Sequence, residues 1–73
     1  MTAYLVIIEP AGDGTGFGAY VPDLPGCVAV GDTVDQVEER IRGAIEFHIR
    51  GLREDGIEVP APSTILKEIE VLK

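Results

Sequence analysis

Two side chains of this 73-residue chain could form a nucleophile and its base, because Cys27 is the single thiol and His48 the single imidazole. A cysteine paired with a histidine can carry out acyl or phosphoryl transfer. However, Cys27 begins an apolar segment, and His48 falls on the apolar stripe of a predicted helix, between Ile45 and Leu52. A small buried thiol and a core imidazole explain both positions. We therefore expect no catalytic residues and no enzymatic activity.

Two other patterns suggest chemistry but lack the required context. Asp23, Asp32 and Asp35 could gather as metal ligands, yet each suits a local role in a proline turn, before a helix cap or in a first helical turn. The stretch GDGTGFG at 12–18 has phenylalanine where a dinucleotide-binding loop needs its third glycine, and the element that follows reads as a strand. We expect no metal and no cofactor.

Composition narrows the class of protein and of partner. Thirteen acidic residues against six basic ones give a formal net charge of −7, the wrong sign for neutralising phosphates, so direct DNA or RNA binding is not expected. A basic protein is a more suitable partner. The longest apolar run, at 4–8, is far below the ~20 residues of a membrane helix. With no export signal at the N-terminus and one cysteine, we expect a single cytoplasmic domain spanning 1–73.

The chain reads as four strands and one helix in the order β-β-β-α-β. Strands are predicted at 3–9, 17–21, 27–30 and 64–72, with turns at 10–16 and 22–26. In the helix, Thr33 can serve as the N-cap, and Gln36 can complete a capping box. Gly56 stands where a left-handed residue would end the helix. We predict an α+β fold with an antiparallel-type sheet and one helix packed on one face.

The predicted strands are apolar on more faces than one helix can cover. In the segment at 3–9 both alternating sets of side chains are apolar, which is typical of a strand buried on both faces. The helix offers a single amphipathic stripe. A second subunit or another partner is therefore expected over the remaining face, although that face could also simply be half-exposed. Phe47, on the polar side of the helix, is a further candidate contact.

Two motifs resemble the signature of the HicB antitoxin family. The first is YVPDLPGCVAVGDTVDQVEE at 20–39, and the second is HIRGLREDGIEVPAPS at 48–63. The resemblance implies a β-β-β-α-β fold similar to part of ribonuclease H, and self-association as a dimer or tetramer. It also implies binding to and inhibition of HicA, a small basic RNA-cleaving toxin. Longer members carry a further DNA-binding segment, which is not expected in this chain.

The resemblance and the residue analysis together leave one preferred function and its rivals. We expect a non-catalytic antitoxin-like protein that inhibits a HicA-like toxin. The alternative is an orphan homo-oligomeric module with a regulatory or structural use and no toxin, and a small hydrolase is a third hypothesis. The residues expected to contact a partner are Tyr20, Asp23, Leu24, Asp32 and Phe47.

Overall fold

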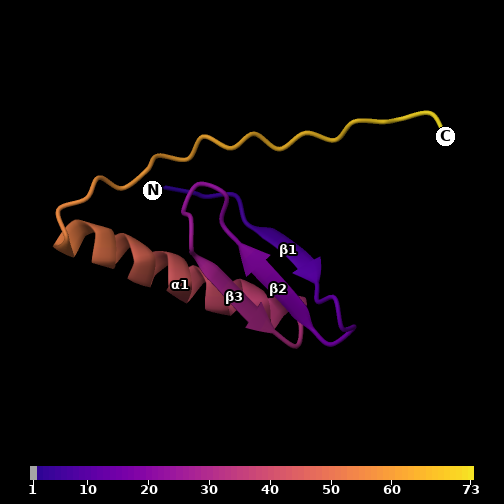
Figure 1. The fold of residues 1–73 in the computed structure, drawn as a ribbon, viewed down its shortest axis with the longest axis horizontal. Coiled ribbons are helices and arrows are strands. Elements are labelled where there is room, and N and C mark those ends of the chain that lie inside the picture. Colours follow the sequence, from indigo (N-terminus) through magenta and orange to yellow (C-terminus); the bar gives the residue numbers. More distant parts are fainter. Residues whose placement is uncertain (1) are drawn as a thin grey trace.

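The computed structural model describes residues 2–73, which form three strands and one helix (Figure 1). The elements are β1 (Ile7–Pro10), β2 (Phe17–Tyr20), β3 (Val28–Gly31) and α1 (Val34–Glu54). The strands pair antiparallel in the order β1-β2-β3, and α1 packs against β2 and β3 on one face of this sheet. The predicted α+β arrangement is confirmed. The likeness to ribonuclease H stays a prediction.

The connection between β1 and β2 is a tight glycine-rich turn, as the sequence predicts. The amide of Ala11 donates to the carbonyl of Gly16 at 3.0 Å, and the amide of Gly14 donates back to the carbonyl of Ala11 at 3.0 Å. Gly14 and Gly16 both have positive φ, at 80° and 74°. Glycine adopts this left-handed backbone without the steric cost that a Cβ atom would add.

The connection between β2 and β3 is held by hydrogen bonds between its own backbone amides and carbonyls. The amide of Val21 donates to the carbonyl of Cys27 at 3.2 Å, and that of Leu24 donates to the carbonyl of Val21 at 3.0 Å. The amide of Cys27 in turn donates to the carbonyl of Leu24 at 3.0 Å. The side chains of these three residues are buried, so this loop supplies half of the six core residues found within residues 2–73.

The N-terminus of α1 is capped by side chains, with one difference from the prediction. The hydroxyl of Thr33 accepts a hydrogen bond from the amide of Gln36 at 3.1 Å, as expected of an N-cap. The side-chain carbonyl of Gln36 accepts from the amide of Asp32 at 2.6 Å, not from that of Thr33. The bond to the side chain of Gln36 therefore comes from the residue before the N-cap, whereas in a capping box it comes from the N-cap residue itself.

α1 ends at Glu54, and Gly56 follows it as the predicted left-handed residue. Gly56 has φ of 69°, and its amide donates to the carbonyl of Arg53 at 3.1 Å. The amide of Ile57 donates to the carbonyl of Leu52 at 2.9 Å. These two bonds define a Schellman motif, which satisfies carbonyls that the helix itself leaves free.

The core lies between the sheet and the first half of α1. The buried side chains in the described part of the chain are Ala19, Val21, Leu24, Cys27, Val37 and Ile41. The helix stripe continues through His48 and Leu52, but these residues are only half-buried. A 21-residue helix rises ~31 Å, whereas four-residue strands span ~13 Å. The sheet therefore covers only the first half of the stripe.

The first strand starts later than predicted, at Ile7 and not at residue 3. Its pairing with β2 runs from Pro10 opposite Phe17 to Ile7 opposite Tyr20. Beyond Tyr20 the chain turns away, so residues 3–6 face a loop and find no ladder partner there.

The predicted fourth strand at 64–72 is wrong for this structure. Residues 57–73 contain no helix or strand. Figure 1 shows this segment as a long tail that returns past the sheet and then leads away from it. The apolar alternation in 64–72 identifies a segment suited to a strand, but a strand also needs a neighbour for its amides and carbonyls. Within residues 2–73 the segment has none.

Within residues 2–73, α1 is not apolar enough over its length to cross a bilayer.

Candidate partner-binding face

The sheet has an outer face, turned away from α1, that the described chain leaves uncovered. The register places Ile7, Tyr20 and Val28 in one row across the strands. The next row contains Glu9, Gly18 and Val30. Ala19 and Ala29, one residue along, point toward the helix and the core.

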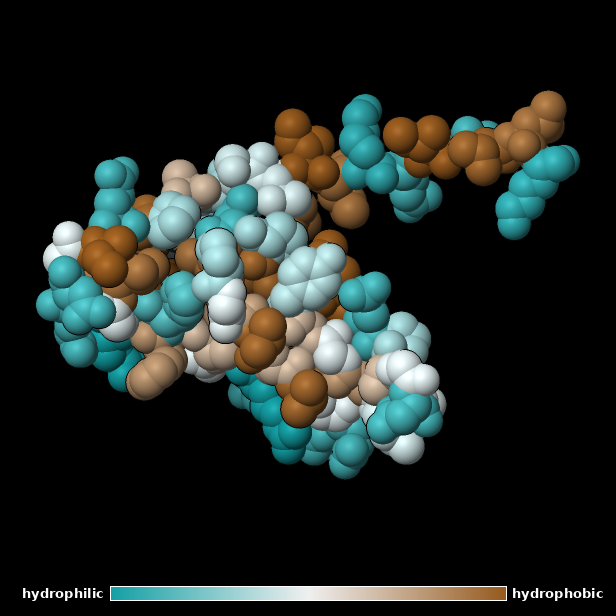
Figure 2. All heavy atoms as spheres, in the orientation of Figure 1, coloured by the Kyte–Doolittle hydropathy of each residue, from teal (hydrophilic) through white to brown (hydrophobic). Residues whose placement is uncertain are grey.

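The apolar residues of the outer face are solvent-exposed. Val28 is 63% exposed, Val30 is 70% exposed and Tyr20 is 44% exposed. Figure 2 shows apolar side chains gathered over the strands on the visible face. The prediction that one helix leaves apolar strand surface uncovered is confirmed for this face.

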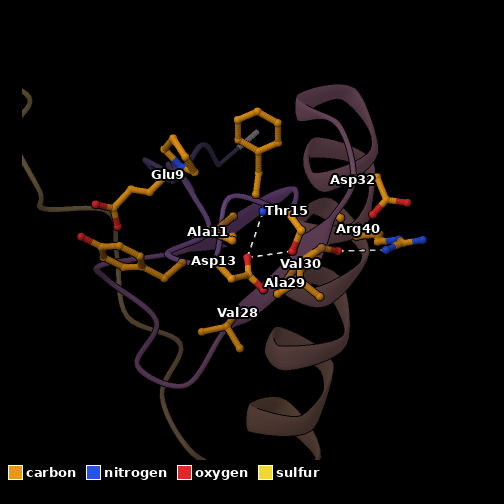
Figure 3. Close-up of a pocket in the computed structure, with 15 residues that line it drawn as sticks. Glu9, Ala11, Asp13, Thr15, Val28, Ala29, Val30, Asp32 and Arg40 are labelled. Atoms are coloured by element: carbon orange, nitrogen blue, oxygen red, sulfur yellow. Dashed lines mark hydrogen bonds between the residues drawn. The ribbon is translucent and has the colours of Figure 1, made fainter.

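The outer face forms a shallow hollow with a volume of about 620 Å³ (Figure 3). Val28, Ala29 and Val30 lie along it, and the turn with Asp13 and Thr15 lies at its edge. The hollow is broad and open, so it suits a protein surface better than a small ligand.

The rim of the hollow is mainly acidic. Glu9, Asp13 and Asp32 line it together with one cation, Arg40. A guanidinium N–H of Arg40 donates to the backbone carbonyl of Val30 at 2.9 Å. This bond holds the arginine against the free edge of β3, and the three carboxylates outnumber this cation on the rim.

Asp13 is held in a fixed position within its turn. Its carboxylate accepts hydrogen bonds from the hydroxyl of Thr15 at 2.7 Å and from the amide of Thr15 at 2.9 Å. The hydroxyl bond is the main reason that the pKa of Asp13 is lowered. The rim carboxylate therefore stays charged at neutral pH.

The predicted contact residues other than Asp23 fall in three different places. Tyr20 lies on the outer face and Asp32 on its rim. Leu24 is fully buried in the core, so in this structure it supports the turn from within. Phe47 is 73% exposed on α1, on the other side of the molecule from the outer face. The structure thus does not bring the five residues together.

Asp23 has a structural role that the sequence did not indicate. Its carboxylate accepts from the hydroxyl and amide of Thr64, at 2.8 and 3.2 Å. It also accepts from the amide and hydroxyl of Ser63, both at 3.1 Å. The pKa of Asp23 is lowered, chiefly by the hydroxyl of Thr64. Asp23 therefore anchors a segment forty residues further along the chain.

The thiol considered for nucleophilic chemistry is poorly placed for it. Cys27 is 3% exposed, and burial raises the pKa of its thiol, which disfavours the reactive thiolate. His48 is half-buried on α1. Across residues 2–73, no three His, Cys, Asp or Glu side chains cluster as metal ligands would.

Sequence analysis missed several residues of the outer face. Val28 and Val30 read as part of a short apolar strand, but only the register shows that both point outward. Their alternation with Ala29 was the available signal. Glu9 lies within β1, but only the register shows that it shares this face with Val30, and Arg40 comes from the helix, so neither could be placed here from the sequence.

The described part of the chain forms a small sheet with a helix on one face and an uncovered apolar surface on the other, and comparison with known proteins gives its family. The family model described as the HicB-like antitoxin of bacterial toxin–antitoxin systems matches residues 4–71. The chain belongs to this family.

Two known proteins are similar to this chain over most of its length. The chain is 36% identical over 69 residues to a UPF0150 protein of Synechocystis, covering 94% of this chain and 86% of that protein. It is 40% identical over 62 residues to an uncharacterized 14.9 kDa protein from the rep-hol intergenic region of Haemophilus phage HP1. That match covers 85% of this chain but spans only 45% of the phage protein.

Proposed function

We propose that this protein is a non-catalytic antitoxin that binds and inhibits a small, basic, HicA-type RNA-cleaving toxin. Membership of the HicB-like family supports the antitoxin role and the existence of a toxin partner. The observation that carries the proposal for this chain is the uncovered outer face, which has an apolar centre and an acidic rim.

The chemistry of the outer face suits a basic protein. Val28, Val30 and Tyr20 supply apolar surface, and burying one such side chain contributes about 1.5–3 kcal/mol. Glu9, Asp13 and Asp32 around them attract positive charge. Complementary charge accelerates encounter and selects the partner, while the apolar centre slows dissociation.

The non-catalytic part of the proposal rests on the side chains that could have acted. The thiol of Cys27 is buried with a raised pKa. Inhibition by occupying the surface through which a toxin meets RNA needs no chemistry from the antitoxin. Tyr20 and Asp32 belong to this contact surface in our proposal.

Phe47 provides a second, separate contact in the proposal. It is exposed on α1, so a toxin seated on the outer face does not reach it. An exposed aromatic side chain among charged neighbours is typical of interface hot spots. We assign Phe47 to contacts within a larger assembly, since the proposed antitoxin also forms a homo-oligomer.

The test is binding to the HicA-type toxin encoded beside the gene, with the full-length chain and isothermal titration calorimetry. Val30→Lys places a charge at the apolar centre, opposite a basic partner, and is expected to weaken binding by at least ~10-fold. Ile57→Lys adds the same side chain at another exposed apolar position, after the end of α1, and should leave the affinity within ~3-fold.

The outcomes separate the candidates. If the wild-type chain neither binds the toxin nor restores growth of cells that express it, the antitoxin function is wrong and the orphan homo-oligomeric module is favoured. If Val30→Lys binds as tightly as the wild-type chain, the toxin uses a different surface.

A further inference from the structure

Residues 65–73, the extended arm, carry apolar side chains that nothing in the described chain covers. Ile65 and Ile69 are each 80% exposed, Leu66 is 70%, Val71 is 73% and Leu72 is fully exposed. Single exposed apolar residues are ordinary, but five within eight positions of one segment are not. The arm therefore has the composition of a buried element, but its apolar side chains are exposed to solvent.

The arm leaves the body at a fixed point. The four hydrogen bonds from Ser63 and Thr64 to the carboxylate of Asp23 hold the chain immediately before it. The hydroxyl of Tyr4 donates to the carbonyl of Pro60 a few residues earlier. Within residues 2–73, no such bond is formed by residues after Thr64, and Figure 1 shows the arm continuing away from the sheet. The anchoring directs the arm outward.

The arm alternates as a strand does, with more apolar residues on one side than on the other. Residues 65, 69 and 71 fall on one side, with Lys67 between them, and the other side carries Glu68 and Glu70 between two leucines. Such a strand is expected to turn its apolar side toward a core and its carboxylates toward solvent. It lacks only a neighbouring strand.

The sheet offers one free edge that fits. In the described part of the chain, β1 is paired on one side only, with β2. The opposite edge, on β3, has the carbonyl of Val30 already engaged by Arg40. Beside β1, the side chains of Tyr4, Val6 and Ile8 pack on the core but remain half-exposed. A strand added at β1 would cover them with its apolar side.

We propose that the extended arm is exchanged between two copies of this chain and adds as a fourth strand at the β1 edge of the other copy. Two-fold symmetry lets both arms and both free edges be satisfied at once, which closes the assembly as a dimer. The arm holds two lysines and two glutamates, so it is neutral in a chain of net charge −7. An arm without net charge docks on an acidic copy without adding repulsion.

This inference specifies the self-association that accompanies the proposed function, but it does not depend on a toxin. The first measurement is hydrogen exchange of the wild-type chain, alone, at concentrations on both sides of the dimer dissociation constant from light scattering. Alternate amides in the arm are expected to become protected as the dimer forms, because only the amides that face the partner strand are bonded.

The second measurement compares two arm variants. Ile69→Lys removes an apolar contact twice per dimer and is expected to weaken dimerisation by at least ~100-fold. Glu68→Lys puts the same side chain on the other side of the arm and should change dimerisation by less than ~3-fold. Both positions are exposed and outside the core, so unfolding curves should show an intact fold.

Each contrary result overturns the exchange. A monomer at all concentrations, whether its arm is protected or not, excludes it. A dimer whose arm amides exchange freely, or that Ile69→Lys does not weaken, is built from another surface. None of these measurements uses the toxin, so they can fail while toxin binding holds, and the reverse.

Discussion

At the scale of single residues, Gly16 is the position with the least room. A Cβ atom added there would lie 2.4 Å from the backbone carbonyl oxygen of Gly31, and the residue has φ of 74°. Gly14 in the same turn has φ of 80° but open space around it, and Gly12 has open space without a positive φ. Substitutions at these three glycines can therefore distinguish the effect of a steric clash from the effect of a positive φ.

Replacing each glycine of this turn by alanine should give a graded loss of stability. Gly12→Ala is expected to change the free energy of unfolding by less than ~0.5 kcal/mol, and Gly14→Ala to lower it by about 1 kcal/mol. Gly16→Ala adds a clash with rigid backbone, so a loss of about 2–4 kcal/mol is expected. Urea unfolding measures all three. Equal losses for Gly14→Ala and Gly16→Ala would show that β3 moves aside.

At the scale of elements, the sequence predicts what is local and misses what depends on neighbours. The helix, its cap at Thr33 and the left-handed Gly56 after its end are confirmed, because their signals lie within a few residues of the helix ends. The start of β1 could not be predicted, because it depends on where β2 stops pairing at Tyr20. The prediction of a strand at 64–72 failed for a related reason. The alternation of apolar residues does not show which molecule provides the strand that would pair with it.

For the candidate site, too, one part was predicted from the sequence and another was not. The mismatch between apolar strands and one helix predicted an uncovered face, and the exposure of Val28 and Val30 confirms it. Individual contact residues were harder to choose, since neighbours in sequence can face opposite ways. Leu24 is buried directly beside Asp23, whose carboxylate is exposed enough to bind Ser63 and Thr64.

The anchor of the segment before the arm should depend on pH. The pKa of Asp23 is lower in the folded chain than its ordinary value, so the anchor stabilises the fold above that ordinary value and loses its effect as pH falls through the lowered pKa. The hydroxyl of Thr64 is the largest cause, so Thr64→Val should move the pKa of Asp23 toward its ordinary value, and Ser63→Ala should move it less. A carboxyl-carbon NMR titration measures this pKa. An unchanged pKa in Thr64→Val would contradict the anchor.

At the scale of the whole molecule, net charge gives the two proposed interfaces opposite responses to salt. Each copy carries a formal charge of −7, so two copies repel one another, whereas a basic toxin is attracted. Raising ionic strength from about 0.1 M to about 1 M shortens the Debye length from ~10 Å to ~3 Å. Screening should therefore tighten the dimer and weaken the toxin complex.

Light scattering and titration calorimetry at matched salt concentrations measure the two responses, each expected to be several-fold. A toxin affinity that is independent of salt would mean that the acidic rim of Glu9, Asp13 and Asp32 takes no part in recognition. A dimer that weakens with salt would mean that ion pairs, not apolar strand contacts, hold it together.

The excess length of α1 over the sheet has a consequence for the way the molecule opens. The first half of the helix rests on β2 and β3 and contains the buried Val37 and Ile41, whereas the half beyond Ile45 has no fully buried side chain. Local unfolding of the last turns of α1 breaks few contacts and leaves the rest of the fold intact. The first half of α1 is therefore the more stable half. The less stable half ends where the chain continues toward the extended arm.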